Sequence, residues 1–484
     1  MYPAADTATL LIDGKWLEAD DGATFPVTAP ATGELIGRAA DAGAAETDRA
    51  IDAAAAAFGP WSAETAYARA DVLRRAHDLM LERAEDLAVL MSTEQGKPLK
   101  AARNEVRYAA DFLAWFAEEA KRVHGRTIPS NRRGHRFQVL KQPVGVVAGI
   151  TPWNYPMSMI TRKVAPAVAA GCTIVLKPAE QTPLCAVAVL ALLEEAGLPP
   201  GVANLVTTAR PEPVGERLLA DPRVRKLTFT GSTEVGMRLA AGAAATMKRV
   251  SMELGGHAPM IVFDDADPVH AAKGATLAKF LNTGQACISP NRIYVQRGVV
   301  EAFTEALVAR TATLSAGPGT SPGVSIGPLV DDAALTKVQR QVDDAVERGA
   351  RLVLGGTRLT EDGLDRGCFF APTVLADIDE TMLIYREETF GPVAAVIPFD
   401  TEEEVVARAN DTAYGLASYL YTRDLGRATR VSEALRFGIV GVNDINPTGA
   451  QAPFGGVGVS GLGREGGVEG LDEYLDVKLI GTAL

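Results

Sequence analysis

The chain has 484 residues, of which 47% are hydrophobic and 22% charged, a composition typical of a globular protein with two or three domains. Its formal net charge of −12, with no block of Lys or Arg, argues against nucleic-acid binding. The longest apolar run, residues 185–193, is too short to span a membrane, so we expect no membrane association.

The N-terminal part of the chain has a helical pattern. Residues 45–113 carry apolar side chains at i, i+3 and i+4, as the stretch 70–80 shows most clearly. A polar, arginine-rich stretch at 126–141 interrupts this pattern. We expect this stretch to be either a disordered linker or an excursion that packs on a partner subunit.

After Pro143, short apolar strands alternate with helical segments. This alternation predicts βαβ units with a parallel sheet, whose ligands bind beyond the carboxyl ends of the strands. A second α/β block is expected over 258–442, and an extended tail over 474–484. The expected strands are 144–150, 173–177, 202–206, 225–230, 260–263, 292–296, 351–354 and 393–398.

Two residues have the chemistry of a nucleophile and its base. Cys287 ends a helix-patterned run before the expected strand 292–296, and Glu253 adjoins glycines in Met252-Glu-Leu-Gly-Gly256. A thiol nucleophile needs a base to form its thiolate, and a second proton transfer to activate water. The alternative is that Cys287 is a core cysteine and Glu253 a surface charge.

The cysteines and histidines suggest no other special site. The four cysteines form no CxxC pair, and the five histidines are scattered. We therefore expect neither a disulfide framework nor a metal site, and a reducing, cytoplasmic setting fits best.

Polar residues follow three of the expected strands. Asn154 lies on a stiff loop between prolines, where its amide can stabilise an oxyanion, or can simply mark a turn. Lys177 and Glu180 are placed for ribose hydroxyls, and a carboxylate there would repel the 2′-phosphate of NADP. Gly231 and Ser232 precede a helix, where backbone N–H groups bind phosphate. The alternatives are solvated charges and a turn glycine.

A GxGxxG sequence also occurs, at Gly456–Gly461. It does not follow an expected strand or open a βαβ unit, which the dinucleotide-binding mechanism requires. We therefore do not interpret it as a cofactor fingerprint.

Together these segments resemble the aldehyde dehydrogenase superfamily over nearly the whole chain. Seven motifs occur in the family's order, which makes a chance match negligible. They are Thr151-Pro-Trp-Asn-Tyr-Pro156, Lys177-Pro-Ala-Glu180, Phe229-Thr-Gly-Ser232, Met252-Glu-Leu-Gly-Gly256, Gly284-Gln-Ala-Cys287, Glu387-Glu-Thr-Phe-Gly-Pro392 and Pro453-Phe-Gly-Gly456.

The resemblance implies an α/β fold of three parts, assembled as a homodimer or homotetramer. These are a Rossmann-like NAD(P) domain (1–122 and 143–252), an α/β catalytic domain (253–452) and a small β oligomerisation flap (123–142 and 470–484). The resemblance further implies catalysis by Cys287, Glu253 and Asn154. The residues that it implies for cofactor binding, with NAD preferred and NADP possible, are Trp153, Lys177, Glu180, Gly231, Ser232, Glu388 and Phe390.

Within the superfamily the chain most resembles the succinate-semialdehyde dehydrogenases, as at 115–120, 160–163 and 461–466. In that group the arginine matching Arg162 helps to hold a substrate carboxylate. Leu281, however, replaces a second pocket arginine, and the loop 443–452 differs from the group's. We therefore expect oxidation of a polar or anionic aldehyde to its acid through a thiohemiacetal and a thioester.

Three alternatives to this function remain open. The enzyme could act on neutral aliphatic or aromatic aldehydes. It could instead pass the acyl group to CoA or phosphate, although Glu253 favours water because hydrolysis needs a base. The third is a non-catalytic binding or structural protein on the same fold.

Overall fold

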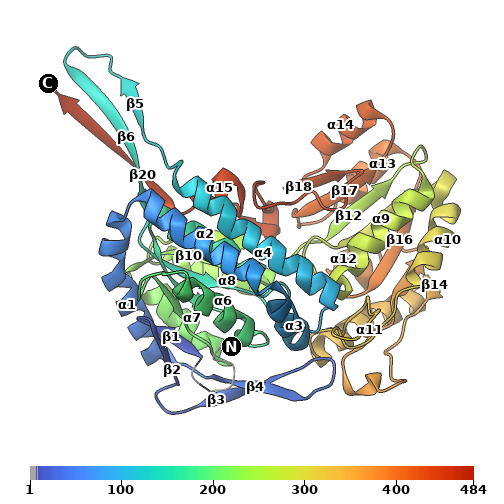
Figure 1. Cartoon of the computed structure of the whole chain (residues 1–484). Helices are drawn as coiled ribbons and strands as arrows, with labels where there is room; N and C mark the ends of the chain where they lie inside the picture. Colours follow the sequence, from blue (N-terminus) through green and yellow to red (C-terminus); the bar gives the residue numbers. More distant parts are fainter. Residues whose placement is uncertain (1–6, 8) are drawn as a thin grey trace.

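The computed structural model describes residue 7 and residues 9–484. Residues 1–6 and 8, which begin the first predicted domain range, lie outside the described residues. Figure 1 shows two α/β bodies side by side, and a narrow arm of strands that projects from the first and ends at the C-terminus. The expected α/β fold class is confirmed.

The first body is built on a sheet of order β19-β11-β10-β7-β8-β9-β1-β2. Its strands β7 to β11 are parallel to their neighbours, whereas β19 and β1 join the edges in antiparallel fashion. Since β8 and β10 flank β7, the strand order reverses there, which is where such sheets bind ligands. The strands are β1 (Leu10–Ile12), β2 (Lys15–Leu17), β7 (Val146–Ile150), β8 (Thr173–Lys177), β9 (Ala203–Leu205), β10 (Val224–Thr230), β11 (Arg249–Glu253) and β19 (Gly461–Leu462).

Helices cover both faces of this sheet. One apolar cluster packs α2 to α6 against it, and a second packs α1 and α7 against the opposite face, with α8 at its margin. Strands buried on both faces read as continuous apolar runs, which is why the sequence shows them clearly. The helices are α1 (Ala44–Ala63), α2 (Ala66–Glu82), α3 (Ala84–Gln95), α4 (Leu99–Ala120), α5 (Ser158–Ala170), α6 (Pro183–Glu195), α7 (Pro211–Ala220) and α8 (Thr233–Ala244).

The second body repeats this plan on a sheet of order β14-β15-β16-β13-β12-β17-β18. Only the edge strand β14 is antiparallel to its neighbour among these described strands. Helices α9 and α10 cover one face, and α11 to α14 cover the other.

The bounds of these elements are β12 (Ala258–Val262), α9 (Pro268–Phe280), β13 (Pro290–Gln296), α10 (Val300–Thr311), α11 (Asp332–Glu347), β14 (Arg351–Leu354), β15 (Thr373–Ala376), α12 (Leu383–Arg386), β16 (Val393–Phe399), α13 (Glu402–Asn410), β17 (Ala417–Tyr421), α14 (Leu425–Ala434) and β18 (Ile439–Val442).

The projecting arm joins distant parts of the chain. Strand β6 (His135–Pro143) lies between β5 (Arg126–Pro129) and β20 (Leu475–Ala483). The pairing of β20 with β6 runs from Leu475 opposite Pro143 to Ala483 opposite His135. The arginine-rich stretch is therefore mostly strand, and its disordered alternative is wrong, because β6 pairs with β5 on one edge and with β20 on the other. A short helix, α15 (Gly467–Asp472), precedes β20, and a separate hairpin joins β3 (Thr24–Thr28) to β4 (Leu35–Ala40).

The predicted domain boundary falls inside a strand of the first body. Glu253 is the last residue of β11, so the boundary between residues 252 and 253 falls inside that strand. Strand β19, from beyond residue 452, pairs with the same strand. The division into domains stays a prediction.

Within residue 7 and residues 9–484, no helix has the length and apolar character needed to cross a membrane. The longest apolar run of the sequence lies in α6, whose side chains are mostly buried against the other helices of the first body.

Candidate active site

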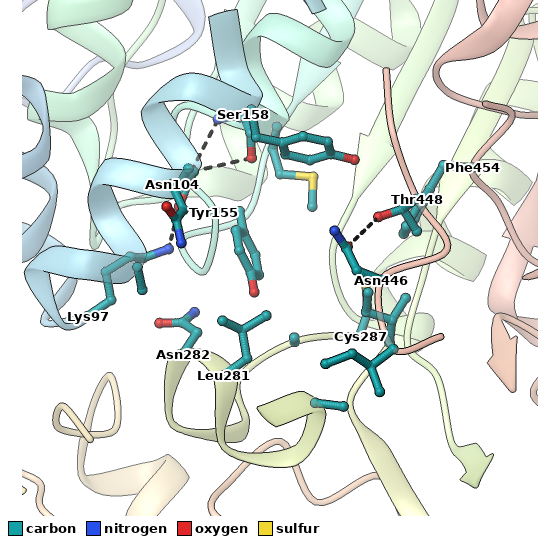
Figure 2. A pocket seen from close by; sticks show the side chains of 18 of the residues that line it. Lys97, Asn104, Tyr155, Ser158, Leu281, Asn282, Cys287, Asn446, Thr448 and Phe454 are labelled. Atoms are coloured by element: carbon teal, nitrogen blue, oxygen red, sulfur yellow. Dashed lines mark hydrogen bonds and ion pairs between the residues drawn. The ribbon is translucent and has the colours of Figure 1, made fainter. Parts of the chain in front are cut away.

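A cavity of about 450 Å³ lies where α4 and α5 of the first body meet the second body. The second body contributes the turn 281–288 and the loop 445–454 to its wall. In Figure 2, Lys97, Tyr155 and Asn282 lie on one side of this cavity, and Asn446, Thr448 and Phe454 on the other. Cys287 is one of the lining residues.

A strained turn carries Cys287. Helix α9 ends at Phe280, so the helix does not continue to Cys287 as the sequence pattern suggested. Asn282 and Thr283 adopt φ values of 50° and 60°, which are rare for side chains other than glycine. Gly284 follows at φ 76°, and a Cβ on it would lie 2.1 Å from the Gly391 carbonyl oxygen. The turn therefore needs this glycine and external support.

Hydrogen bonds to the segment 327–330 give that support. The Thr283 hydroxyl accepts from the Gly327 N–H at 3.0 Å, and Gln285 Nε2 donates to the Pro328 carbonyl at 3.2 Å. Gln285 Oε1 accepts from the Val330 N–H at 3.0 Å. Strain held by surrounding contacts is a common property of functional sites.

The surroundings of Cys287 favour a neutral thiol. Burial raises its pKa to about 12, and the carboxylates of Glu253 and Glu388 act in the same direction, whereas Arg162 opposes them. At neutral pH the sulfur is therefore protonated, and it needs a base to become a nucleophile.

Glu253 is a buried carboxyl at the end of β11. Its side chain is 3% exposed, and neither carboxylate oxygen has a hydrogen-bond partner among the described residues. Burial, followed by the charge of Glu465, raises its pKa well above the usual range, while Arg162 and Lys163 lower it. A Cβ on Gly455 would lie 2.7 Å from Glu253 Oε1, so this glycine leaves room for the carboxyl. The surface-charge alternative is wrong.

Asn154 follows β7 and forms two hydrogen bonds with the turn that carries Cys287, one as donor and one as acceptor. Its Nδ2 donates to the Gln285 carbonyl at 3.0 Å, and its own carbonyl accepts from Asn282 Nδ2 at 2.9 Å. The residue is 3% exposed. Because an amide nitrogen carries two N–H donors, one remains for a developing oxyanion.

The candidate cofactor residues of the first body gather where the strand order reverses. Trp153 follows β7, Lys177 ends β8 and Gly231 follows β10. Lys177 Nζ forms an ion pair with Glu180 at 3.1 Å. Ser232 caps α8, since its hydroxyl accepts from the Val235 N–H at 3.4 Å.

The second body brings Glu388 and Phe390 to the same place. Glu388 Oε1 accepts from the Gly256 N–H at 2.8 Å. Burial raises the pKa of this carboxyl, and the Gly256 N–H and the charges of Lys337 and Lys279 oppose the rise. Phe390 has a φ of 55° and packs edge-on against Trp153, with ring centroids 5.7 Å apart.

Arg162 lines the cavity, whereas Lys163 is not a lining residue and its Nζ donates to the Thr230 hydroxyl at 2.7 Å. The guanidinium of Arg162 donates to the Tyr108 hydroxyl at 3.0 Å and lies 4.3 Å from the centre of the Phe454 ring. Its Nη1 is also 3.5 Å from a carboxylate oxygen of Glu465. The charge of Arg162 is therefore partly balanced before any substrate binds.

Comparison with known proteins assigns the family. The sequence model described as "Aldehyde dehydrogenase family" matches residues 16–480. The chain belongs to the aldehyde dehydrogenase family. This confirms the resemblance, and the molecule is an NAD(P)-dependent aldehyde dehydrogenase.

Several relatives match this aldehyde dehydrogenase over nearly its whole length. It is 52% identical to a glutarate-semialdehyde dehydrogenase of Pseudomonas aeruginosa and 53% identical to a 3-sulfolactaldehyde dehydrogenase of Pseudomonas putida, each covering 97% of this chain and 96% of the relative. A solved succinate-semialdehyde dehydrogenase of Burkholderia pseudomallei is 49% identical with a TM-score of 0.96, and covers 100% of both chains. The aldehyde dehydrogenase fold is thereby confirmed.

The residues of the dehydrogenase fit a dinucleotide at the strand reversal. A Cβ on Gly231 would lie 2.5 Å from the Phe229 ring, so a larger residue does not fit here without a shift. The backbone before α8 therefore has no side chain at this position. Lys177 and Glu180 would hold the adenosine ribose, Gly231 and Ser232 the phosphates, and Trp153, Glu388 and Phe390 the nicotinamide half.

Sequence reasoning missed several residues of this dehydrogenase's cavity. Lys97, Glu105 and Tyr108 line it from the region of α4, and Asn446 and Thr448 from the loop before Phe454. In the sequence, Lys97 and Glu105 lie eight residues apart in a charged stretch with a helical pattern. Such a pattern is typical of a solvent-exposed helix face. A departure of the loop 443–452 from the group's pattern was the only signal for Asn446 and Thr448.

Proposed function

We propose that this aldehyde dehydrogenase oxidises a polar or anionic aldehyde, such as a semialdehyde, to the carboxylic acid, and prefers NAD to NADP. The observation that carries the proposal is the grouping of three side chains around the Cys287 turn, of which Cys287 itself lines the cavity, Asn154 bonds to the turn and Glu253 acts on the thiol through its charge. These are the Cys287 thiol, the unpartnered buried carboxyl of Glu253 and the Asn154 amide.

In the first half-reaction, the Cys287 sulfur attacks the aldehyde carbon. Glu253 takes the thiol proton as the carbon–sulfur bond forms, and the carbonyl oxygen becomes an oxyanion. Asn154 Nδ2 and the backbone N–H of Cys287 donate to this oxyanion. A dinucleotide whose nicotinamide half is held by Trp153, Glu388 and Phe390 would supply the hydride acceptor, and the substrate would remain on Cys287 as a thioester.

In the second half-reaction, Glu253 first releases the thiol proton to solvent and then takes a proton from water. The water oxygen bonds to the thioester carbon, the carbon–sulfur bond breaks, and the acid product leaves while the sulfur regains a proton. A buried carboxyl without hydrogen-bond partners suits this role, because its oxygens are free to accept from water. This favours hydrolysis over transfer to CoA or phosphate.

The substrate proposal rests on Arg162 and on the relatives. Arg162 lines the cavity, and its Nε has no hydrogen-bond partner among the described residues. The relatives' names give glutarate semialdehyde, succinate semialdehyde and 3-sulfolactaldehyde as substrates. Each of these carries an anionic group besides the aldehyde. Leu281, at 44% exposure on the cavity wall, adds no second charge.

The experiment that tests the proposal compares kcat/KM for a panel of aldehydes. The panel contains ω-carboxy, sulfonate, neutral aliphatic and aromatic aldehydes, each assayed with NAD and with NADP, with and without CoA. Anionic aldehydes should be preferred and the free acid should be the product. A preference for neutral aldehydes would overturn the substrate assignment, and a CoA-dependent product would overturn the acceptor.

Replacing Arg162 with leucine should raise KM selectively for anionic aldehydes. A charge-assisted hydrogen bond is worth about 1.5–3 kcal/mol, so we expect KM for an ω-carboxy aldehyde to rise about 10- to 100-fold. Because Glu465 already balances part of the Arg162 charge, we expect an increase in KM at the lower end of this range. The neutral aldehyde of equal length is the internal control, and an equal rise for both would show that Arg162 does not sense substrate charge.

Replacing Glu180 with serine should lower the ratio of kcat/KM with NAD to kcat/KM with NADP. The change removes repulsion of the 2′-phosphate and releases Lys177 from its ion pair. The expected effect is about 1–3 kcal/mol, or roughly 5- to 150-fold in the NAD/NADP ratio of kcat/KM. Glu216→Ser, an exposed change on α7, is the matched control. A wild-type enzyme that favours NADP, as the name of its Escherichia coli relative would suggest, would contradict the assignment.

We further propose a homodimer or homotetramer in the cytoplasm. The strand β20 exposes Val477 and Leu479 at 68% and 63%, and such apolar side chains on an arm suit a partner subunit. All four cysteines are free, as expected of a reducing compartment.

A further inference from the structure

Lys97 and Glu105 form a buried ion pair beside the catalytic cavity. The side chains of both residues are 1% exposed, and Lys97 Nζ contacts Glu105 Oε2. Lys97 immediately precedes Pro98 at the start of α4, and Glu105 lies within that helix. Neither residue belongs to the catalytic set inferred above, although both line the cavity.

The ammonium group of Lys97 has three neighbours. Besides Glu105, it donates to the Asn154 carbonyl at 2.7 Å and lies 4.2 Å from the centre of the Tyr155 ring. The backbone of Lys97 is itself fixed, since its carbonyl accepts from the Ser92 hydroxyl at 2.7 Å. Figure 2 shows the Lys97 side chain reaching toward Tyr155. The lysine therefore bonds directly to the residue that carries the oxyanion-binding amide.

Glu105 holds the other end of the same segment. Its Oε1 accepts from the backbone N–H groups of Met157 and Ser158 at 3.1 and 3.2 Å. These groups lie at the start of α5, whose first N–H donors have no partner within the helix. The ion pair therefore contacts both ends of the segment 154–158: Lys97 bonds to the Asn154 carbonyl, and Glu105 bonds to the N–H groups at the start of α5.

The Asn154 carbonyl is shared between the two bodies. It accepts from Lys97 on one side and from Asn282 Nδ2, at 2.9 Å, on the other. The Asn154 side chain in turn donates to the Gln285 carbonyl, two residues before Cys287. A shift of the Asn154 backbone would therefore move its amide relative to the Cys287 sulfur.

A buried ion pair is a costly way to stabilise a core. Apolar residues of similar volume often serve as well or better, so a purely structural role would not require charges here. A charged donor, however, makes a stronger and more directional bond to a carbonyl than a neutral group does. The direction of the Asn154 amide is the property that such a bond can fix.

We propose that Lys97, supported by Glu105, is a positioning residue that sets the Asn154 amide for the thiohemiacetal oxyanion. The inference rests on the proposed function, in which Asn154 donates to that oxyanion. Lys97 acts through Asn154 and transfers no proton itself.

The test is a mutant cycle on the acylation step, in the full-length enzyme. Lys97→Met with Glu105→Gln removes both charges and leaves no unpaired carboxylate. Removing one oxyanion donor typically costs about 10²- to 10³-fold. A misplaced donor should therefore slow the single-turnover formation of NADH by roughly 10- to 100-fold, with KM for NAD nearly unchanged. In an Asn154→Ala background, the same double change should add no more than about twofold, because the amide it positions is gone.

The controls separate this proposal from stability and from the function itself. Lys226→Met with Glu473→Gln removes another buried lysine and its carboxylate neighbour, 3.5 Å apart and away from the cavity, and should leave acylation unchanged. Asn154→Ala alone must slow acylation; if it does not, the proposed role of Asn154 fails and so does the positioning built on it. If the Met/Gln pair does not fold, Lys97→Gln with Glu105→Gln carries the same cycle.

Two results would overturn the proposal while the dehydrogenase activity itself stands. One is wild-type acylation by the folded Lys97/Glu105 double variant. The other is a full additional loss in the Asn154→Ala background, which would show that Lys97 acts independently of the amide.

Discussion

Replacing Cys287 with alanine is expected to abolish aldehyde oxidation while NAD binding stays within about twofold of wild type. Loss of a covalent nucleophile costs on the order of 10⁴-fold or more in turnover. The thiol acts on the aldehyde, whereas the candidate cofactor residues lie on other segments. The measurements are steady-state NADH formation and the Kd for NAD by calorimetry.

Cys368→Ala is the matched control for this prediction. Cys368 is a partly exposed thiol that contacts Asp332 and does not line the cavity. It should keep full activity. Substantial turnover by the Cys287→Ala variant would mean that another group forms the covalent intermediate.

Replacing Glu253 with glutamine should slow the enzyme mainly at thioester hydrolysis. The amide has nearly the same shape but cannot take a proton, and loss of a general base typically costs about 10²- to 10⁴-fold. If acylation still proceeds, a burst of NADH will precede slow turnover. Hydroxylamine, which attacks a thioester without a base, should restore much of the rate.

Unchanged steady-state rates in Glu253→Gln would rule out the base assignment. A burst that hydroxylamine relieves places the defect after hydride transfer. Loss of the burst itself would show that Glu253 is also needed to deprotonate the Cys287 thiol.

The same variant should alter stability in a pH-dependent way. Burial raises the pKa of Glu253 in the folded state, so the stability that its neutral form contributes is present below the unfolded pKa of about 4.3. That contribution is lost as pH rises through the folded pKa, where the buried carboxyl must ionise. Glu253→Gln should therefore have a higher Tm than wild type at alkaline pH, and the difference should shrink toward pH 4.

Much of the architecture was predictable because it depends on local pattern. The run 173–177 is apolar at nearly every position and is bounded by turn residues, and it is β8. The short strands β1 to β4 gave no such signal, because β1 is apolar but only three residues long, and β2 to β4, at a sheet edge or in a separate hairpin, carry few apolar residues in a row. Their pairing depends on distant neighbours such as β9.

The turn at Cys287 shows where pattern reasoning fails. The apolar spacing of the stretch before Cys287 predicts helix, but the chain leaves the helix at Phe280. The left-handed residues that follow are stabilised by bonds from the segment 327–330. No local propensity favours Thr283 in that conformation, so tertiary contacts decide it.

The sequence by itself determined the family, the α/β class and the residue types of the chemistry, because motif order, short apolar runs and helical patterns can all be read along the chain. The tertiary structure alone decided that Glu253 is buried without a partner, that the Arg162 charge is shared with Glu465, and that Lys97 bonds to the Asn154 carbonyl. These features arise from segments far apart in the chain. Burial, charge pairing and pKa depend on what packs around a group, and neighbouring residues in the sequence do not specify it.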